Sequence, residues 1–289
     1  MLFINDLPDA VSSTIKIFAD DTKMYRKVNT EEESKILQSD IDKLYEWARI
    51  WQLKFNAAKC KVMHKGYSNR QENYTMEGLT LEKVFKEKDL GVTIDNELKF
   101  HDHVQLSVTK ANQILGIVKR TFSCLDKEIL PIVYKCQVRP HLEYGNVIWH
   151  PRYVANISKV EQVQRRATKL IPGFQDKTYE DRLKELKLYS MEYRRKRGDY
   201  KIIYKIINEI DRIHPSQLFQ FATGNTRGHS KKLFKQSVNK DVRKHVFSQR
   251  VIDAWNSLTE DIISSKSLNI FKAKLDKHWE SEWYEISTE

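Results

Sequence analysis

The chain has 289 residues, of which 40% are hydrophobic, so it is long enough to bury a sizeable core as one large domain or two. Its formal net charge of +11 and pI of about 9.3 favour a polyanionic partner, either nucleic acid or an anionic membrane. No apolar run approaches the roughly 20 residues that span a bilayer, and no secretory signal follows Met1. These features disfavour a membrane partner and predict a protein that is not secreted.

The cysteines narrow the class of protein further. Cys60, Cys124 and Cys136 are few, odd in number and far apart in the sequence. No Cys-x-x-Cys pair accompanies a histidine cluster, which disfavours both a zinc site and a disulfide framework. The pattern predicts a reducing compartment, cytoplasmic or nuclear.

Two adjacent aspartates stand near the start of the chain, after an apolar stretch over residues 1–6 and a break at Pro8. Alternating β-prone residues flank them from Ile15 to Val28, which predicts a β-hairpin with Asp20 and Asp21 at the turn. Neighbouring carboxylates repel each other unless water screens them or a cation lies between them. Oxygen ligands of this kind suit a hard divalent ion such as Mg²⁺. The alternative from these residues alone is an ordinary Asp-rich turn.

The segment after this hairpin has the signature of an amphipathic helix. Thr30 and Glu33 form a capping box, and the following apolar residues recur at helical spacing. We expect Asp40 and Asp42 on the opposite, solvated face and do not count them as catalytic. The expected buried stripe consists of Ile36, Leu37, Ile41, Leu44, Tyr45, Ala48 and Trp51.

Further strand-like runs complete the first part of the chain. They cover residues 55–64, 74–81 and 84–95. Gly91, in the last of these runs, permits a close backbone approach or a bulge. We expect this β-rich part to end near residue 100.

The remainder reads as almost wholly helical. Helices are predicted over about residues 102–121, 126–138, 154–170, 179–186, 190–210, 241–257 and 268–279, the second being stopped by Pro140. Residues 223–240 have little hydrophobic periodicity. We therefore predict that they form an exposed basic loop that acts as a linker. The expected fold class is α+β, with parts at residues 1–100, 101–222, 223–240 and 241–289.

The order of short motifs along the chain resembles a known family. The motifs are Ile4–Pro8 and Phe18–Thr22, the helix Leu37–Trp51, the turn Asn56-x-x-Lys59-Cys60, and Leu90–Val92, Tyr144–Trp149, Gln164–Gly173 and Phe247–Leu258. Together they are similar to the reverse transcriptases of non-long-terminal-repeat (LINE-type, jockey-like) retrotransposons, a class of transposable element. The resemblance covers nearly the whole chain and implies the second half of a polymerase palm, built of antiparallel hairpins with a packing helix, followed by a helical thumb and a C-terminal region.

The resemblance also implies a chemistry for the aspartates. Members of that family build DNA on an RNA template by nucleotidyl transfer with two metal ions, held by three carboxylates. It implies that Asp20 is a direct Mg²⁺ ligand with Asp21 beside it, both catalytic, and that Phe18 and Ala19 fill the strand beneath. The third carboxylate belongs to an earlier strand, and Asp6 and Asp9 lie in the loop before the hairpin. We therefore expect the fingers, the third ligand and an endonuclease to lie outside this chain, which should be inactive alone.

Other residues are implied in binding the expected RNA template and DNA primer. Lys59 would lie near the phosphates of the incoming nucleotide, and Gly91 belongs to a segment similar to the primer grip. Basic helix residues could form a phosphate-tracking face: Arg165, Arg166, Lys169, Arg194, Arg195, Lys196 and Arg197. The alternatives are solvated basic faces, a non-catalytic nucleic-acid-binding module, or the product of a decayed mobile element.

Overall fold

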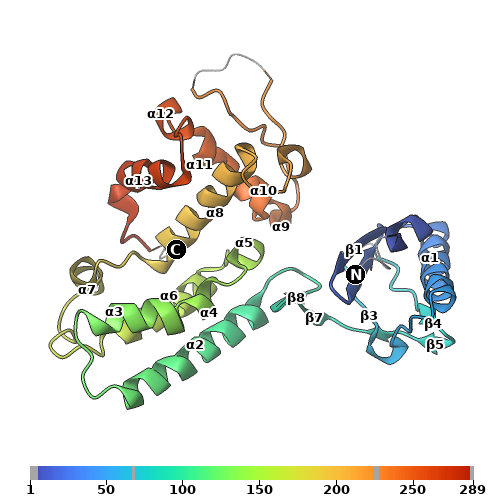
Figure 1. Cartoon of the computed structure of the whole chain (residues 1–289), viewed down its shortest axis with the longest axis horizontal. Coiled ribbons are helices and arrows are strands. Elements are labelled where there is room, and N and C mark those ends of the chain that lie inside the picture. The colour runs from blue at the N-terminus through green and yellow to red at the C-terminus, as the bar shows by residue number, and fades with distance from the viewer. Residues whose placement is uncertain (1–5, 67–68, 224–227, 287–289) are drawn as a thin grey trace. The chain divides into compact units, whose positions relative to one another are not determined.

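The computed structural model describes residues 6–66, 69–223 and 228–286, so the apolar residues expected before Asp6 lie outside the described residues (Figure 1). The chain divides into two compact units, Met1–Lys99 (unit 1) and Phe100–Glu289 (unit 2). Unit 1 contains short strands and one long helix, whereas unit 2 is built of helices. The mixture of helix and small antiparallel hairpins agrees with the expected α+β class. No helix of the described residues is both long and apolar enough to cross a membrane.

The predicted hairpin is present in unit 1 as strands β1 (Thr14–Phe18) and β2 (Asp21–Tyr25). Phe18 pairs with Asp21, so the two-residue turn consists of Ala19 and Asp20. The expected turn was therefore displaced by one residue, and Asp21 is the first residue of β2. Two-residue turns need an unusual backbone conformation, and here Ala19 adopts it, with φ of +54°.

Helix α1 (Glu31–Ile50) starts at the predicted capping box, in which the Glu33 N–H donates to the hydroxyl of Thr30. Its Leu44, Trp47 and Ala48 form a small core with Leu7 and Ile15. Leu7 lies in the 3₁₀ helix η1 (Leu7–Ala10), which leads into β1.

Two residues of α1 and Trp51, which directly follows it, lie differently from the sequence prediction. Asp40 is fully buried, whereas Ile36 and Trp51 are 39% and 44% exposed. Asp40 precedes Leu44 by four residues and therefore shares its helix face. Its carboxylate accepts hydrogen bonds from the N–H and hydroxyl groups of Ser12 and Ser13. Asp42 is exposed, as expected.

The rest of unit 1 consists of short paired strands. The antiparallel hairpins are β4 (Thr75–Met76) with β5 (Leu79–Thr80) and β7 (Lys86–Asp89) with β8 (Val92–Asp95), while β3 (Lys61–Val62) pairs in parallel with β6 (Glu82–Lys83). Gly91, with φ of +86°, lies in the turn between β7 and β8. A second small core packs Ile41 of α1 against residues of these strands and of the 3₁₀ helix η2 (Ala57–Lys59).

The first half of unit 2 is a set of packed helices. They are α2 (His101–Thr121), α3 (Ile129–Val133), the π-helix η3 (Tyr134–Val138), α4 (Pro140–Glu143), α5 (Asn146–Trp149), α6 (Val154–Thr168) and α7 (Tyr179–Leu186). Residues 126–138 were expected as one α-helix, but the second half of that stretch is wound as π-helix. Pro140 begins α4 rather than only ending a helix, because the first position of a helix needs no N–H.

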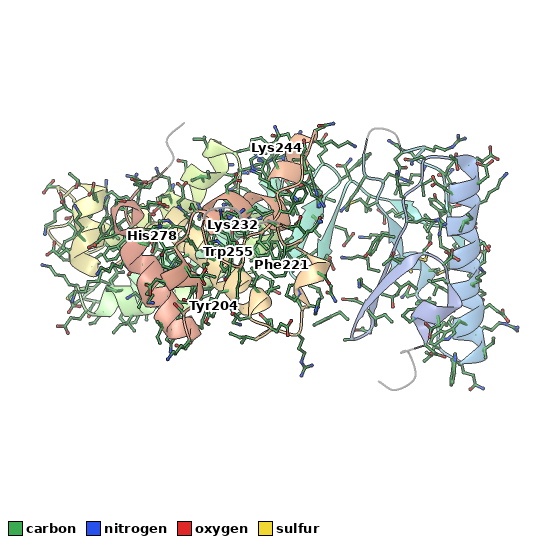
Figure 2. The ribbon with its side chains drawn as sticks, turned by 90° about the horizontal axis from the view of Figure 1, so that it is seen from above. Tyr204, Phe221, Lys232, Lys244, Trp255 and His278 are labelled. Atoms are coloured by element: carbon green, nitrogen blue, oxygen red, sulfur yellow. The ribbon has the colours of Figure 1, made fainter. Side chains whose placement is uncertain are left out.

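Helix α8 (Met191–Ile207) organises the second half of unit 2, where it lies beside α13 (Figure 1). Tyr204 and Trp255, labelled in Figure 2, belong to one core that joins α8 to the closing helices. The expected helix over residues 241–257 is divided into three short ones. The elements after α8 are η4 (Pro215–Gln217), α9 (Asp241–Lys244), α10 (Phe247–Arg250), α11 (Ile252–Asn256), α12 (Glu260–Ile263), α13 (Leu268–His278) and η5 (Glu280–Glu282).

The stretch expected as an exposed linker, residues 223–240, is attached to this core in its described part. Leu233 is 1% exposed, and its N–H and carbonyl groups both bond to the side chain of Asn256. The indole N–H of Trp255 donates to the carbonyl of Lys231. Periodicity could not reveal this, because the segment is held by side chains that lie more than 20 residues later. Residues 224–227 of the predicted linker lie outside the described residues.

Candidate metal-binding hairpin and nucleic-acid interface

The carboxylates of Asp20 and Asp21 lie at the turn end of the β1–β2 hairpin. Asp20 is in the turn, Asp21 begins β2, and both side chains are exposed. Throughout the described part of the chain, no side-chain hydrogen bond or ion pair involves either carboxylate. Both groups are therefore available as oxygen ligands.

The hairpin has one face toward the core of unit 1 and one toward solvent. Ile15 and Ile17 pack on the core, while Phe18 pairs with Asp21 on the opposite face. Phe18 is 63% exposed, so the expectation that Phe18 and Ala19 fill the strand beneath the aspartates is wrong for this structure. The period of two along a strand places the side chain of Phe18 on the opposite face from that of its partly buried neighbour Ile17.

An ion pair joins the aspartate hairpin to the hairpin that contains Gly91. The Lys23 ammonium pairs with the carboxylate of Asp89. Lys23 shares the exposed face of β2 with Asp21, and burial lowers the pKa of its ammonium group. Asp89 directly precedes the Leu90–Gly91 turn. The structure thus links two of the sites predicted from the sequence.

Lys59 lies at the end of η2 and is exposed. Its ammonium group belongs to no ion pair within the described residues, so it remains available for a phosphate. Ala57 of the same 3₁₀ helix is buried in the second small core with Ile41, which anchors this turn against α1.

The ligand set for a metal ion is incomplete in the described residues. Within them, no group of three or more His, Cys, Asp or Glu side chains is arranged to hold a metal ion. Mg²⁺ is often bound by one or two carboxylates together with substrate phosphates and water. Asp20 and Asp21 fit that kind of site and supply only part of the ligands that two ions would need.

The basic run Arg194–Arg197 does not form a single face of α8, because successive residues of a helix are rotated by about 100°. Arg195 is 1% exposed and its guanidinium has no hydrogen-bond partner among the described residues. It cannot contact a phosphate in this conformation, which corrects the prediction for that residue. Lys196 pairs with Glu282 and lies 4.1 Å from the ring centroid of Trp279.

Arg194, Arg197 and Lys201 lie on the same face of α8, at spacings of three and four residues. Arg194 pairs with Glu143, which also lies 3.6 Å from Arg139, and Arg197 pairs with Asp276. Burial, followed by the charges of Arg197 and Lys272, lowers the pKa of Lys201. We call this group the α8 cationic cluster, and its members are Lys135, Arg139, Arg194, Arg197, Lys201 and Lys272.

The α8 cationic cluster was only partly found from the sequence. The spacing of Arg194, Arg197 and Lys201 was a usable signal that the run of four consecutive cations concealed. Arg139 carried no such signal, since it is more than 50 residues away and meets Arg194 only through Glu143. Burial and then the charges of Arg139 and Arg194 lower the pKa of Lys135. Lys135 is therefore close enough to these two arginines to be counted in the cluster.

The basic residues at the end of α6 also differ in whether a phosphate can reach them. The Arg165 guanidinium lies 4.2 Å from the ring centroid of Tyr179, so it packs against α7. Arg166 and Lys169 are exposed, and Arg166 donates to the side chain of Asn112 on α2 at 3.2 Å. Two of the three predicted residues are thus accessible to a phosphate backbone.

Comparisons with known proteins agree with the motif order. The chain is 27% identical over 189 residues to the RNA-directed DNA polymerase from mobile element jockey of Drosophila funebris, covering 60% of this chain. It is 26% identical to the probable RNA-directed DNA polymerases from transposon BS and transposon X-element of Drosophila melanogaster, covering 59% and 60% of this chain. The chain spans about 20% of the length of these curated relatives.

Two other comparisons found nothing. No family model matches the chain, and no solved structure matches it. The curated relatives therefore carry the assignment: about 60% of the chain is a region similar to the reverse transcriptases of non-long-terminal-repeat retrotransposons.

Proposed function

We propose that this chain acts as part of an RNA-directed DNA polymerase, with unit 1 contributing to the palm and the helices of unit 2 to the thumb. The observation that carries the proposal is the pair of exposed carboxylates at the turn end of the β1–β2 hairpin, in a chain similar to four such polymerases. Neither aspartate forms an ion pair within the described residues, so both carboxylates are free to bind a cation.

In this proposal Asp20 ligates Mg²⁺ directly and Asp21 supports the same ion from the first position of β2. A bound Mg²⁺ supplies charge neutralisation for nucleotidyl transfer. The chain's own contribution is to hold two negative charges next to each other at the turn end of the hairpin, which packs on the core through Ile15 and Ile17 of β1 and Met24 of β2. Lys59 offers an additional positive charge for a phosphate.

The α8 cationic cluster is the proposed contact of unit 2 with the template–primer backbone. Six cations are gathered there, and Glu143 and Asp276 pair with three of them. A phosphate backbone would relieve the mutual repulsion that contributes to the lowered pKa of Lys135 and Lys201.

Metal binding can be tested separately from activity with Mn²⁺ as a paramagnetic probe. In the ¹⁵N-labelled full chain, we expect Mn²⁺ to broaden the amide signals of residues 19–22 first, and excess Mg²⁺ to reverse the effect. The double variant Asp20→Asn, Asp21→Asn should abolish this broadening. The control Glu32→Gln, which also removes a charge from an exposed side chain of unit 1, should preserve it. Equal broadening in the double variant would refute the proposed metal site.

A second candidate function is a non-catalytic nucleic-acid-binding module. It is favoured by the α8 cationic cluster together with the absence, in the described residues, of any three-ligand metal group. Primer extension on an RNA template distinguishes the two functions when the duplex affinity is measured in parallel. Salt-dependent binding that persists in the double variant, without extension by either protein, supports the module alone.

A further inference from the structure

A cavity of about 740 Å³ lies in unit 2, between the end of α8, the segment around η4 and helix α10. This volume is in the range of pockets that bind small molecules. Three aromatic rings line it: Phe219, Phe221 and Phe234. Phe219 is buried and held edge-on against Phe247, with centroids 5.8 Å apart, whereas Phe221 and Phe234 are 42% and 49% exposed. Figure 2 labels Phe221 among the elements of this part of unit 2.

The cavity wall also contains a buried polar group without a partner. Gln249 of α10 lines the cavity and is 4% exposed, yet its Oε1 has no hydrogen-bond partner among the described residues. A buried amide oxygen without a partner costs about 1–3 kcal/mol, so such groups are usually satisfied by water or a ligand. An amide can both donate to and accept from the edge of a nucleobase.

The charge of the surrounding sequence points to a polyanion. Residues 205–250 contain ten Lys and Arg but only three Asp and Glu. One of these cations, Arg243, lines the cavity, and so does one of the carboxylates, Glu209, which lies 4.0 Å from His214. Exposed rings beside excess positive charge are the combination by which proteins bind single-stranded nucleic acid.

We propose that this cavity binds one unstacked base of single-stranded RNA or DNA, with Phe221 and Phe234 stacking on the base and Gln249 bonding to its edge. Arg243 then contacts an adjacent phosphate. The inference rests on the proposed function, because it assumes a nucleic-acid partner, and it adds a site distant in sequence from both the aspartates and α6. It distinguishes a base contact from the backbone contacts proposed for the α8 cationic cluster.

The test measures the affinity of the full chain for a fluorescein-labelled single-stranded RNA by anisotropy, with a matched RNA that carries abasic sites. Phe221→Ala should weaken binding of the normal RNA about 5- to 150-fold, the range expected for one stacked base. It should leave binding of the abasic RNA unchanged. For this variant and the normal RNA, the logarithm of the affinity should fall with the logarithm of the salt concentration at the same slope as for the unmodified chain, because no phosphate contact is removed. Gln249→Met, which keeps the volume, should weaken normal RNA binding in the same selective way.

Phe85→Ala is the matched control, since Phe85 is 73% exposed and lies in unit 1. It should bind both RNAs like the unmodified chain. If Phe221→Ala and Gln249→Met also bind both RNAs like the unmodified chain, the base site is overturned while the proposed backbone binding stands. Displacement by N-acetyl-tryptophanamide but not by adenosine monophosphate would overturn it in favour of a peptide ligand. Absence of any RNA binding at low salt would overturn both proposals.

Discussion

The two units differ most in how their cores are built. In unit 2, one cluster of eighteen buried hydrophobic residues joins α8 to the closing helices. In unit 1, two clusters of five buried hydrophobic residues each support α1 and its short strands. Buried apolar area is the main source of stability, and isolated two-stranded sheets are marginal in water. From these clusters of described residues we expect unit 1, which contains the candidate metal hairpin, to be the less stable unit and to unfold first.

The largest expected effect is in the core of unit 2. Trp255→Ala removes a fully buried ring and leaves the carbonyl of Lys231 without its indole donor. We expect a loss of about 3–5 kcal/mol in the free energy of unfolding of unit 2. Denaturant unfolding followed by circular dichroism measures it. Trp51→Ala, at a tryptophan that is 44% exposed, should change stability by only about 0.5 kcal/mol, and an equal loss there would contradict the assigned burial.

A smaller effect is expected for unit 1 in acid. Burial opposes ionisation of Asp40, but hydrogen bonds from Ser13 and Ser12 outweigh it and lower its pKa to about 2. A pKa below the unfolded value stabilises the fold above that value, and the stability is lost as pH falls from about 4 to about 2. Asp40 should thus contribute about 2 kcal/mol to unit 1 near neutral pH.

The comparison with Asp40→Asn isolates this contribution. The variant should be less stable by about that amount at pH 7, and the difference from the unmodified chain should shrink toward pH 2. Urea unfolding at a series of pH values provides the measurement. Asp42→Asn, at an exposed position two residues later, should show no comparable trend. A constant difference between pH 7 and pH 2 would argue against the hydrogen-bonded carboxylate.

The smallest effect concerns the turn of the aspartate hairpin. Ala19 has φ of +54°, a conformation in which a side chain costs about 1 kcal/mol and glycine costs little. Ala19→Gly should therefore stabilise unit 1 by up to about 1 kcal/mol. Ala58→Gly, in η2, should have the opposite sign, because Ala58 has no positive φ to relieve. Thermal unfolding of both variants and of the unmodified chain measures the two changes in stability. Destabilisation by Ala19→Gly would show that the turn is not strained.

Elements with local signals could be predicted from the amino-acid sequence. The capping box at Thr30 placed the start of α1, and alternation on both sides of Asp20 and Asp21 predicted their hairpin. Helix α7 was predicted with its observed bounds, Tyr179–Leu186. Each of these signals is contained in a few neighbouring residues, because hydrogen bonds in a helix or tight hairpin close within a few positions.

Which charged side chains are accessible to a ligand became clear from the packing of the folded chain. Asp40 and Arg195 look like surface residues in the sequence, and both are buried because the faces they occupy meet other elements. The α8 cationic cluster likewise depends on Glu143, which brings Arg139 to Arg194 across more than 50 residues. The charge of a side chain follows from its identity, whereas its burial and partners depend on packing between segments far apart in the chain.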